Sequence, residues 1–434
     1  MAVGSDDAQA AIRTAAVVAT GEELVGGTTV DTNSSWIARK LRPLGVPLVE
    51  IRVVSDGLET IRDAVAEVAR KVDLLLVTGG LGPTPDDRTR DALAAAAGVP
   101  LEEDPQAAAL LAAWFARLGR TPSASNARQA LLPRGAKALR NERGSAPGIE
   151  MSIGRARVIA MPGVPGELRA MVEDAVLPLV KRAATGPAIL ERVLQVVGLP
   201  ESVAGERIAR WMEREEPPLV SDTVKHGVIR VCAADRDDEA GRARLAECVG
   251  DMKAALGDHV FAEGDVSLEE VVVARLRERK ESVAIAESCT GGLIAAAITD
   301  VPGSSEVFVE AHVVYANEAK VRVLAVPTEL IERHGAVSEE VARAMAEGVR
   351  ARAGTKWGLA TTGIAGPAGG SPEKPVGLVH LAVAGPEGEG TRHSRRQLPG
   401  DRESVRRFAV IGTLDLLRRA LLDSGRIASG QNLR

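Results

Sequence analysis

Aromatic residues are scarce in this sequence. Phe, Trp and Tyr make up 2% of its 434 residues, and there is a single tyrosine. Its cores must therefore be aliphatic, and few side chains are available as stacking platforms for single-stranded nucleic acid. The formal net charge of −5 offers no general attraction for nucleic acid either. We expect that nucleic acid is not a partner of this protein.

Cysteines and long apolar runs are also few. The three cysteines, Cys232, Cys248 and Cys289, have neither metal-ligand spacing nor the even count of a disulfide framework. We expect them to be reduced and structural, although Cys289 lies in a stretch rich in polar residues. No segment approaches the length of a transmembrane helix, and residues 1–13 lack the basic and apolar regions of a signal peptide. These features predict a cytoplasmic protein with no membrane partner.

The length of the chain predicts several domains. A chain of 434 residues exceeds what one core usually spans, and 45% hydrophobic with 26% charged residues is typical of a globular protein. The sequence pattern predicts an N-terminal tail at 1–13, an α/β domain at 14–185, an α+β connector module at 186–265, a second α/β domain at 266–423 and a tail at 424–434.

The first α/β domain is predicted to be built on a parallel sheet. Apolar runs at 15–19, 46–54 and 72–77 are typical of strands, and helices are expected after Asp31 and over 60–71. Alternating strands and helices favour a parallel sheet that is covered on both faces. Ligands gather at the carboxyl ends of such strands, where this sequence places polar Thr-Gly turns.

The sharper of these turns runs from Thr78 to Asp87. Its glycines let the backbone approach a phosphate closely, and its aspartates can hold a divalent cation through oxygen ligands. The same pattern also fits a glycine-rich turn whose aspartates cap the next helix, so both interpretations stay open. The candidates in this turn are Thr78, Gly79, Gly80, Gly82 and Thr84 for substrate binding, and Asp86 and Asp87 for a metal.

The connector module carries little sign of chemistry. Strands are predicted at 192–197 and 228–233, and helices at 201–214 and 238–256. It contains no cluster of catalytic residue types. We interpret it as a spacer or a dimerisation element.

In the second α/β domain, an apolar run at 283–286 breaks into small polar residues at Ser288–Gly292. A helix is predicted directly afterwards, at 293–299. A hydroxyl beside a helix N-terminus can attack a carbonyl while backbone amides hold the oxyanion. Serine and threonine at this junction are also what ordinary helix capping requires, and Glu287 fits the role of a helix-start carboxylate.

Other predicted strands of this domain also end in polar turns. The strand at 307–315 runs into Asn317 and Lys320, and the strand at 357–361 ends in Thr362-Gly363 and Gly366. Because no histidine lies in a pattern typical of a Ser-His-Asp triad, lysine is the candidate base for a serine nucleophile, provided that burial keeps its amine neutral. Further elements are a helix from Ser338 to Ala353, a strand at 376–384 and a helix that begins near Arg402.

The first half of the chain resembles the MoaB/MogA-like domain that opens proteins of the CinA (competence/damage-inducible) family. The resemblance rests on Thr20-Gly-Glu-Glu-Leu24, on Asp31-Thr-Asn33, on the Thr78–Thr89 string and on Met161–Leu168. It implies metal-dependent hydrolysis of the pyrophosphate in ADP-ribose. The divalent metal, of unknown identity, would be bound by Asp87 first and then by Asp86 and Asp31, with Glu22 as a weaker candidate for orienting water.

The second half resembles the CinA C-terminal domain, which also occurs alone as a nicotinamide-nucleotide amidase of the PncC type. The matching motifs are Glu287–Gly292, Tyr315–Lys320, His334–Ser338, Thr362–Pro367 and Glu373–Gly377. The resemblance implies deamidation of nicotinamide mononucleotide without a cofactor. Ser288 would be the nucleophile and Lys320 its base, Tyr315, Asn317 and Thr362 would orient the amide, and Arg402 or Arg406 would pair with the phosphate. Further substrate contacts are expected at Thr290, Gly291, Gly292, Gly363 and Gly366.

Two alternatives remain at this point. One is a nucleotide-binding regulatory or interaction protein tied to competence or DNA damage, and the other keeps the first domain as a molybdopterin binder. For the two hydrolytic activities the expected partners are small nucleotides, nicotinamide mononucleotide and ADP-ribose, and the chain is expected to form a homodimer.

Overall fold

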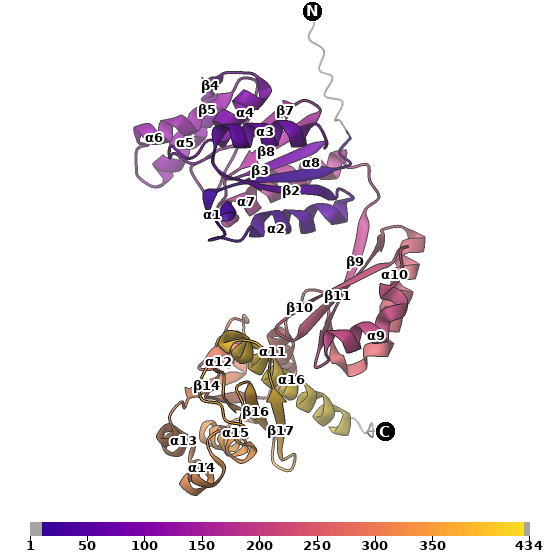
Figure 1. Ribbon diagram of the computed structural model, residues 1–434, viewed down its shortest axis with the longest axis vertical. Coiled ribbons are helices and arrows are strands. Elements are labelled where there is room, and N and C mark those ends of the chain that lie inside the picture. Colours follow the sequence, from indigo (N-terminus) through magenta and orange to yellow (C-terminus); the bar gives the residue numbers. More distant parts are fainter. Residues whose placement is uncertain (1–10, 429–434) are drawn as a thin grey trace, which may run out of the picture. The chain divides into compact units, whose positions relative to one another are not determined.

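Two compact units make up the described part of the chain. A computed structural model describes residues 11–428. One unit extends to Leu190 and includes Arg236–Glu239, and the other holds Glu191–Asp235 and the chain from Ala240 onward (Figure 1). Within 11–428, no helix combines the length and the apolar character that crossing a membrane requires.

The first unit is built on a six-stranded sheet with the strand order β2-β1-β3-β8-β7-β6. Its strands are β1 (Ala15–Thr20), β2 (Leu48–Val54), β3 (Leu74–Thr78), β6 (Lys137–Leu139), β7 (Gly148–Ile153) and β8 (Ala156–Met161). The predicted parallel pairing holds from β2 through β8, but β7 and β6 are antiparallel. The prediction was wrong at this edge because β7 and β8 are joined by a two-residue turn, which allows only antiparallel pairing.

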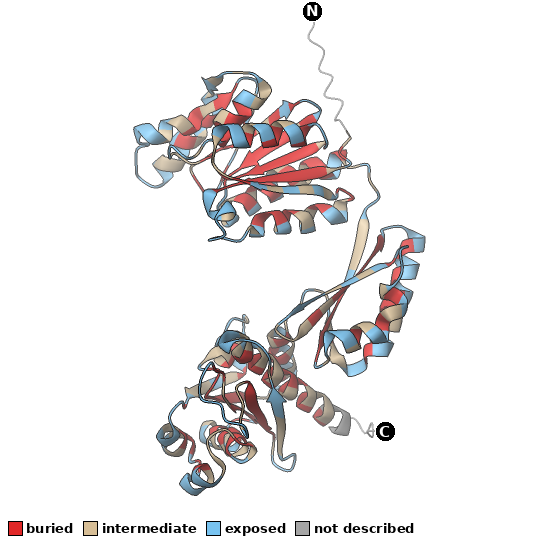
Figure 2. Cartoon of the chain, in the orientation of Figure 1, coloured by how far each residue is buried: buried red, intermediate tan, exposed pale blue. Residues whose placement is uncertain are grey.

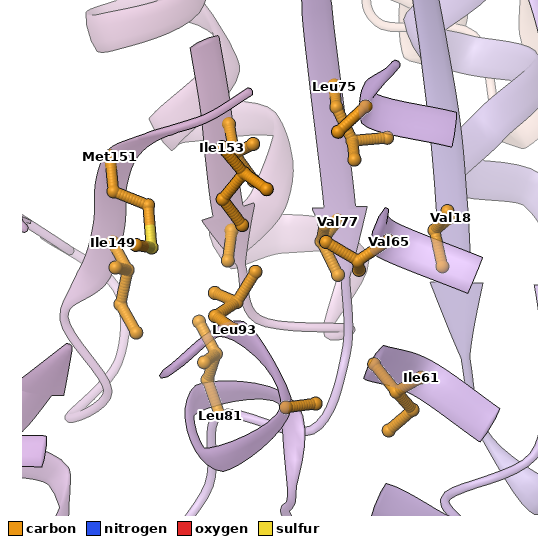
Figure 3. Close-up of a cluster of buried hydrophobic side chains, with 14 of the residues drawn as sticks. Val18, Ile61, Val65, Leu75, Val77, Leu81, Leu93, Ile149, Met151 and Ile153 are labelled. Atoms are coloured by element: carbon orange, nitrogen blue, oxygen red, sulfur yellow. The ribbon is translucent and has the colours of Figure 1, made fainter. Parts of the chain in front are cut away.

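Helices cover both faces of this sheet. Helices α3 and α4 pack on one face, and α2, α7 and α8 pack on the other. Figure 3 shows the core under α3 and α4, where Val18, Val65 and Leu75 lie in one cluster. The helices and remaining short elements are α1 (Glu22–Val25), α2 (Thr32–Leu41), η1 (Arg42–Leu44), α3 (Leu58–Ala69), α4 (Thr89–Ala97), β4 (Leu101–Glu103), α5 (Pro105–Arg117), α6 (Ala124–Ala127), η2 (Arg128–Ala130), β5 (Leu131–Pro133), α7 (Pro165–Met171), η3 (Val172–Val176) and α8 (Leu177–Ala183).

The middle module opens the second unit with a four-stranded sheet in the order β10-β11-β9-β12. Helices α9 and α10 lie together on one side of it (Figure 1). Its elements are β9 (Ile189–Val197), α9 (Glu201–Met212), β10 (Leu219–Lys225), β11 (Val228–Arg236), α10 (Glu239–Leu256), η4 (Gly257–His259) and β12 (Val260–Glu263).

The C-terminal domain has a five-stranded sheet in the order β14-β13-β15-β16-β17. Strands β14, β13 and β15 are parallel, and β16 and β17 extend the sheet antiparallel. Helices α11, α12 and α16 cover one face and α13, α14 and α15 the other. The elements are α11 (Leu268–Arg279), β13 (Val283–Glu287), α12 (Leu293–Thr299), η5 (Ser304–Glu306), β14 (Phe308–Val313), α13 (Asn317–Leu324), α14 (Thr328–His334), α15 (Glu339–Ala353), β15 (Trp357–Gly363), β16 (Leu378–Ala384), β17 (Thr391–Gln397) and α16 (Arg402–Ala428).

Both predicted tails are shorter than the sequence suggested. Ile12 is buried and forms a bridge with Ala184, so the ordered fold of the first unit begins before residue 14. At the other end α16 continues to Ala428, and Ser424 is buried with its hydroxyl bonded to Glu389. The remainder of each predicted tail, 1–10 and 429–434, lies outside the described residues. Figure 2 shows the burial that holds each unit together.

Candidate active sites

The turn after β13 is held by a buried carboxylate. Glu287 is fully buried, and its oxygens accept hydrogen bonds from the backbone N–H groups of Gly292 (2.9 Å), Ile294 (3.1 Å) and Ala295 (2.9 Å). These are N–H groups that the first turn of a helix leaves without helical partners. Glu287 therefore caps α12 and fixes the turn that carries Ser288.

Backbone geometry and one side-chain contact complete this turn. Gly291 and Gly292 have backbone φ values of +60° and +97°, which residues other than glycine rarely adopt. The buried hydroxyls of Thr290 and Thr361 lie 2.7 Å apart, and the N–H of Ser288 donates to the carbonyl of Thr361 at 3.0 Å. The end of β15 thus positions the turn from its other side.

Lys320 reaches Ser288 from the neighbouring segment. Its Nζ lies 3.3 Å from Ser288 Oγ and donates to the carbonyl oxygens of Val314 at 2.9 Å and Tyr315 at 3.0 Å. The side chains are poorly accessible: Lys320 is 1% exposed and Ser288 8%. Within the described residues no carboxylate lies within ion-pair distance of Nζ.

Burial lowers the pKa of Lys320 below its ordinary value of 10.5. Removal from water disfavours the charged ammonium, and this effect outweighs the opposing attraction of the Glu318 carboxylate. A neutral amine has two N–H donors and one lone pair. The two carbonyls account for both donors, so the lone pair is left for the hydroxyl proton of Ser288.

Backbone amides are available in the turn beside the serine. Within residues 11–428, no hydrogen-bond partner is found for the N–H groups of Thr290 and Gly291. The N–H groups farther along α12 are taken by Glu287. An oxyanion formed at Ser288 would therefore meet the free amides of the turn rather than those of the helix itself.

Both predicted arginines lie at this site. Arg402 donates from Nη1 to the carbonyl of Gly366 at 2.8 Å and from Nη2 to the hydroxyl of Tyr315 at 3.1 Å. Arg406 donates to the carbonyl of Thr290 at 2.7 Å. The first turn of α16 thereby joins the loops around Ser288. Tyr315 itself is 60% exposed.

Several other predicted residues have local tasks instead. Thr362 is buried and donates its hydroxyl to the carbonyl of Ala336 at 2.8 Å, which turns that proton away from Ser288. Gly363 is packed against Val379 so closely that a Cβ would collide, and the Asn317 side chain is exposed. The end of the strand that carries Thr361 was expected at the same edge of the sheet as Ser288, but the hydroxyl contact between Thr361 and Thr290 was not predicted.

Cys289 points into the core. It is buried among apolar side chains, and burial raises the pKa of its thiol to about 11. A thiol with that pKa is almost entirely protonated at neutral pH and is a poor nucleophile.

The first unit has a separate cavity of about 540 Å³ at the carboxyl ends of β1, β3 and β8. The glycine turn forms one wall, with Gly79, Gly80 and Gly82 among its lining residues. Gly79 has φ +100°, and a Cβ there would lie 2.5 Å from the carbonyl of Thr20. The carboxylates at the cavity are Glu23, Asp56, Asp86, Asp87 and Glu167.

The structure brings two of the three predicted metal ligands to this cavity. Asp86 and Asp87 line it, and Asp87 Oδ2 accepts hydrogen bonds from Thr84 N (2.8 Å) and Thr84 Oγ1 (2.5 Å). A hydrogen bond from Thr84 also lowers the pKa of Asp86. Asp31 instead caps α2 by accepting from Ser34 N at 3.0 Å and does not line the cavity. Thr78 and Glu22 are not in its wall either, whereas Glu23 is.

The carboxylates of this cavity suit a divalent cation that is held partly by the protein and partly by the substrate. Within the described residues, no three His, Cys, Asp or Glu side chains are grouped closely enough to enclose a metal. Magnesium-like ions are often held by one or two carboxylates together with substrate phosphates. Asp86 and Asp87 fit that arrangement.

Three family models match the three modules of this chain. A family model described as the CinA C-terminal domain matches residues 265–421, and one described as a probable molybdopterin binding domain matches 16–182. Residues 191–262 match a model described as the damage-inducible protein CinA KH domain. The α+β module predicted here is confirmed, and its match to a KH domain model was not predicted.

Individual relatives cover nearly the whole chain. A "CinA-like protein" of Anaeromyxobacter dehalogenans is 43% identical over 93% of this chain and 99% of its own. A "putative competence-damage inducible protein" of Symbiobacterium thermophilum is 42% identical over 94% and 99%. The crystal structure of the competence/damage inducible protein CihA from Agrobacterium tumefaciens is 42% identical, covers 36% of this chain and 93% of its own, and has a TM-score of 0.34. With such relatives and with matches along all three modules, the chain belongs to the CinA family.

Proposed function

We propose that the C-terminal domain is an amidase that converts nicotinamide mononucleotide to nicotinic acid mononucleotide and ammonia. The observation that carries this proposal is the 3.3 Å separation of Lys320 Nζ and Ser288 Oγ, with the lysine buried and its pKa lowered. A serine activated by a neutral lysine is suited to acyl transfer from an amide. The nicotinamide nucleotide as substrate follows from the family motifs.

The chemistry proceeds in two stages. Lys320 takes the proton of Ser288 as Oγ bonds to the carboxamide carbon, and the N–H groups of Thr290 and Gly291 stabilise the resulting oxyanion. The ammonium of Lys320 then returns its proton to the leaving nitrogen, which departs as ammonia and leaves an ester on Ser288. Water, deprotonated by Lys320, cleaves this ester to the carboxylate and restores the serine hydroxyl.

The arginines at α16 are suited to the phosphate of the nucleotide. Each has donors left after its contact with a backbone carbonyl, and guanidinium groups pair well with phosphate oxygens. Arg402 is the stronger candidate, because it bridges two loops at the mouth of the site, whereas Arg406 holds the nucleophile turn through Thr290.

Ammonia release from nicotinamide mononucleotide tests this proposal. We expect release by the wild type and a loss of at least a thousandfold in Ser288→Ala, because no other nucleophile is in place. Ser304→Ala, which removes another buried serine hydroxyl of the same domain, is the matched control and should keep full activity. Equal rates for wild type and Ser288→Ala would overturn the proposal. Tight binding without turnover would favour a regulatory role instead.

A second activity is supported in the first unit. We propose hydrolysis of ADP-ribose there, supported by the glycine-walled cavity and its carboxylates. Asp86 and Asp87 would hold a divalent cation, which when bound neutralises charge on the pyrophosphate. The backbone of Gly79–Gly82 would lie along the phosphates.

Release of AMP from ADP-ribose, with and without a chelator, tests the second activity. We expect Asp87→Asn to lower it at least tenfold, and Asp63→Asn, an exposed aspartate on α3, to leave it unchanged. Activity that resists both the chelator and Asp87→Asn would remove the metal role. Competition between ADP-ribose and molybdopterin in one titration separates this reading from a molybdopterin-binding domain.

A further inference from the structure

A second cavity, of about 830 Å³, lies inside the second unit, between the middle module and the C-terminal domain. The two parts are packed together. Arg418 Nη2 donates to the carbonyl of Asp258 at 2.9 Å, and Arg419 Nη2 lies 3.1 Å from His259 Nδ1. The cavity therefore lies between two parts that contact each other directly, and its volume is in the range of pockets that bind small molecules.

Helices α12 and α16 each line the cavity with one face. On α12 the lining residues recur with helical spacing, and they are Leu293, Ala296, Ala297 and Asp300. The opposite face of α12, with Ile294 and Ile298, is buried in the domain core. On α16 the same spacing gives Glu403, Arg407, Val410 and Ile411. An apolar surface thus runs along both helices and ends in charged groups.

The third wall is the side of the middle sheet that faces these helices. Alternate residues line the cavity, Thr223 and Lys225 on β10 and Val228 and Arg230 on β11, which is the pattern of one sheet face. Phe261 of β12 adds an aromatic ring. This wall therefore places polar side chains beside Val228 and Phe261.

Most charges at this cavity are already paired. Arg230 lies 3.1 Å from Asp265, and Arg407 lies 3.7 Å from Glu403. Within residues 11–424, no ion pair is found for Glu269, Asp300 or Lys225. Glu269 and Asp300 carry two negative charges and Lys225 carries one positive charge, so the groups without an ion pair give the site a net negative charge.

Asp300 is in an electrostatically unfavourable place. It is the C-terminal cap of α12, where the helix dipole repels a carboxylate. With no cation of the described chain beside it, this carboxylate is compensated only by what enters the cavity or by water.

A buried amide points to the same kind of ligand. Gln195 is 8% exposed, lines the cavity, and donates from Nε2 to the carbonyl of Gly264 at 3.2 Å. No partner is found among the described residues for its Oε1, which is a hydrogen-bond acceptor. The side-chain oxygens of Gln195, Glu269 and Asp300 at this cavity are all acceptors, so they fit a ligand that donates.

We propose that this cavity is a binding site for a small organic cation, a protonated amine on an apolar body about the size of one ring. The ammonium would lie among the acceptors at Asp300, Glu269 and Gln195, and the apolar body would pack on Leu293, Ala297 and Phe261. The site is separate from both proposed hydrolytic sites and does not depend on their activity.

Calorimetric titration of the full chain with three compounds of matched shape tests the site. The probes are phenethylamine, its neutral isostere phenethyl alcohol and the anion phenylpropionate. We expect saturable binding of the amine at one site per chain, at least tenfold weaker binding of the alcohol, and no binding of the acid.

Three variants locate the binding. Asp300→Asn keeps the shape of an exposed side chain and should weaken amine binding about tenfold, and Ala297→Trp should abolish it by filling the cavity. Glu332→Gln, at an exposed glutamate of α14, is the matched control and should bind as the wild type does. The proposal is overturned if the alcohol binds as well as the amine, or if Asp300→Asn binds the amine with unchanged affinity. The second outcome counts even if Ala297→Trp fails to fold.

Discussion

At the scale of single residues, the chemistry of this protein depends on what burial does to ionisable side chains. The amine of Lys320 is surrounded by two carbonyl oxygens and a hydroxyl, with no carboxylate beside it. The thiol of Cys289, one residue from the proposed nucleophile, is buried among apolar groups. Burial favours the neutral form of each group. For the lysine this produces a base, and for the cysteine it removes a nucleophile.

We therefore predict that Cys289→Ala retains amidase activity within about twofold, because its thiol, with a pKa of about 11, takes no part. Ammonia release measures the effect, and reaction of the folded protein with a thiol reagent at pH 8 should be slow until denaturant is added. Loss of activity in Cys289→Ala, with the fold intact by circular dichroism, would assign a role to the thiol.

A buried histidine pair predicts how stability depends on pH. His380 Nδ1 lies 2.9 Å from His393 Nε2, and burial together with the charge of His393 lowers the pKa of His380 from 6.5 to about 4. As the pH falls, His380 is therefore protonated in the unfolded chain before it is protonated in the folded protein. The contribution of neutral His380 to the free energy of unfolding is complete above pH 6.5 and is lost as the pH falls to about 4.

We predict that His380→Phe removes about 3 kcal/mol from the fall in the free energy of unfolding between pH 7 and pH 4. Urea denaturation at a series of pH values measures it. His312→Gln, at a partly exposed histidine of β14, serves as the control and should keep the wild-type dependence. An unchanged slope in His380→Phe would show that the pair does not titrate in this way.

At the scale of elements, one carboxylate joins a strand to a helix. Glu287 ends β13 and caps α12 through three N–H groups. In Glu287→Gln one acceptor oxygen becomes an NH₂ group that faces these donors. We predict a loss of about 2 kcal/mol in stability and a fall in kcat with little change in KM, because Ser288 is displaced rather than the substrate contacts. Glu278→Gln on the exposed face of α11 is the control, and equal kcat values for both variants would argue against the positioning role.

The elements also show what can be read from the sequence. Helix α12 was predicted with its observed limits, because an apolar strand, a glycine turn and an alanine-rich segment follow one another without interruption. Strand β17 was missed because Thr391–Gln397 has no apolar residue and pairs with a single strand, β16. Helices α7 and α8 are joined by the π segment η3, which ends two residues before Pro178, a residue that cannot donate to the helical ladder.

The candidate site was predictable only as far as single motifs. The strand-end turns pointed to Ser288 and Lys320, since parallel strands bring their carboxyl ends to one edge. The contacts that shape the site lie between segments distant in sequence, such as Thr290 with Thr361 and Arg402 with Tyr315. No local pattern encodes these contacts, and the same holds for Asp31, whose cap at α2 leaves it outside the first cavity.

At the scale of the whole molecule, two proposed hydrolytic sites lie in different compact units. We predict that they work independently in the full chain. Ser288→Ala should abolish ammonia release and leave AMP release from ADP-ribose within about twofold, and Asp87→Asn should do the reverse. Parallel assays of both variants check this, and a fall of both activities in either variant would reveal coupling. The expected homodimer stays a prediction, which sedimentation velocity can test.

The central claim is that a neutral, buried Lys320 deprotonates Ser288, and the pH dependence of ammonia release from nicotinamide mononucleotide tests it most directly. We predict that kcat/KM rises with pH through a midpoint below 10.5, the ordinary pKa of lysine, and that Lys320→Arg, which cannot lose its proton, is inactive at every pH. Lys356→Met, at an exposed lysine, should follow the wild-type curve. A wild-type rate that does not vary with pH in this way, or an active Lys320→Arg, would contradict the account.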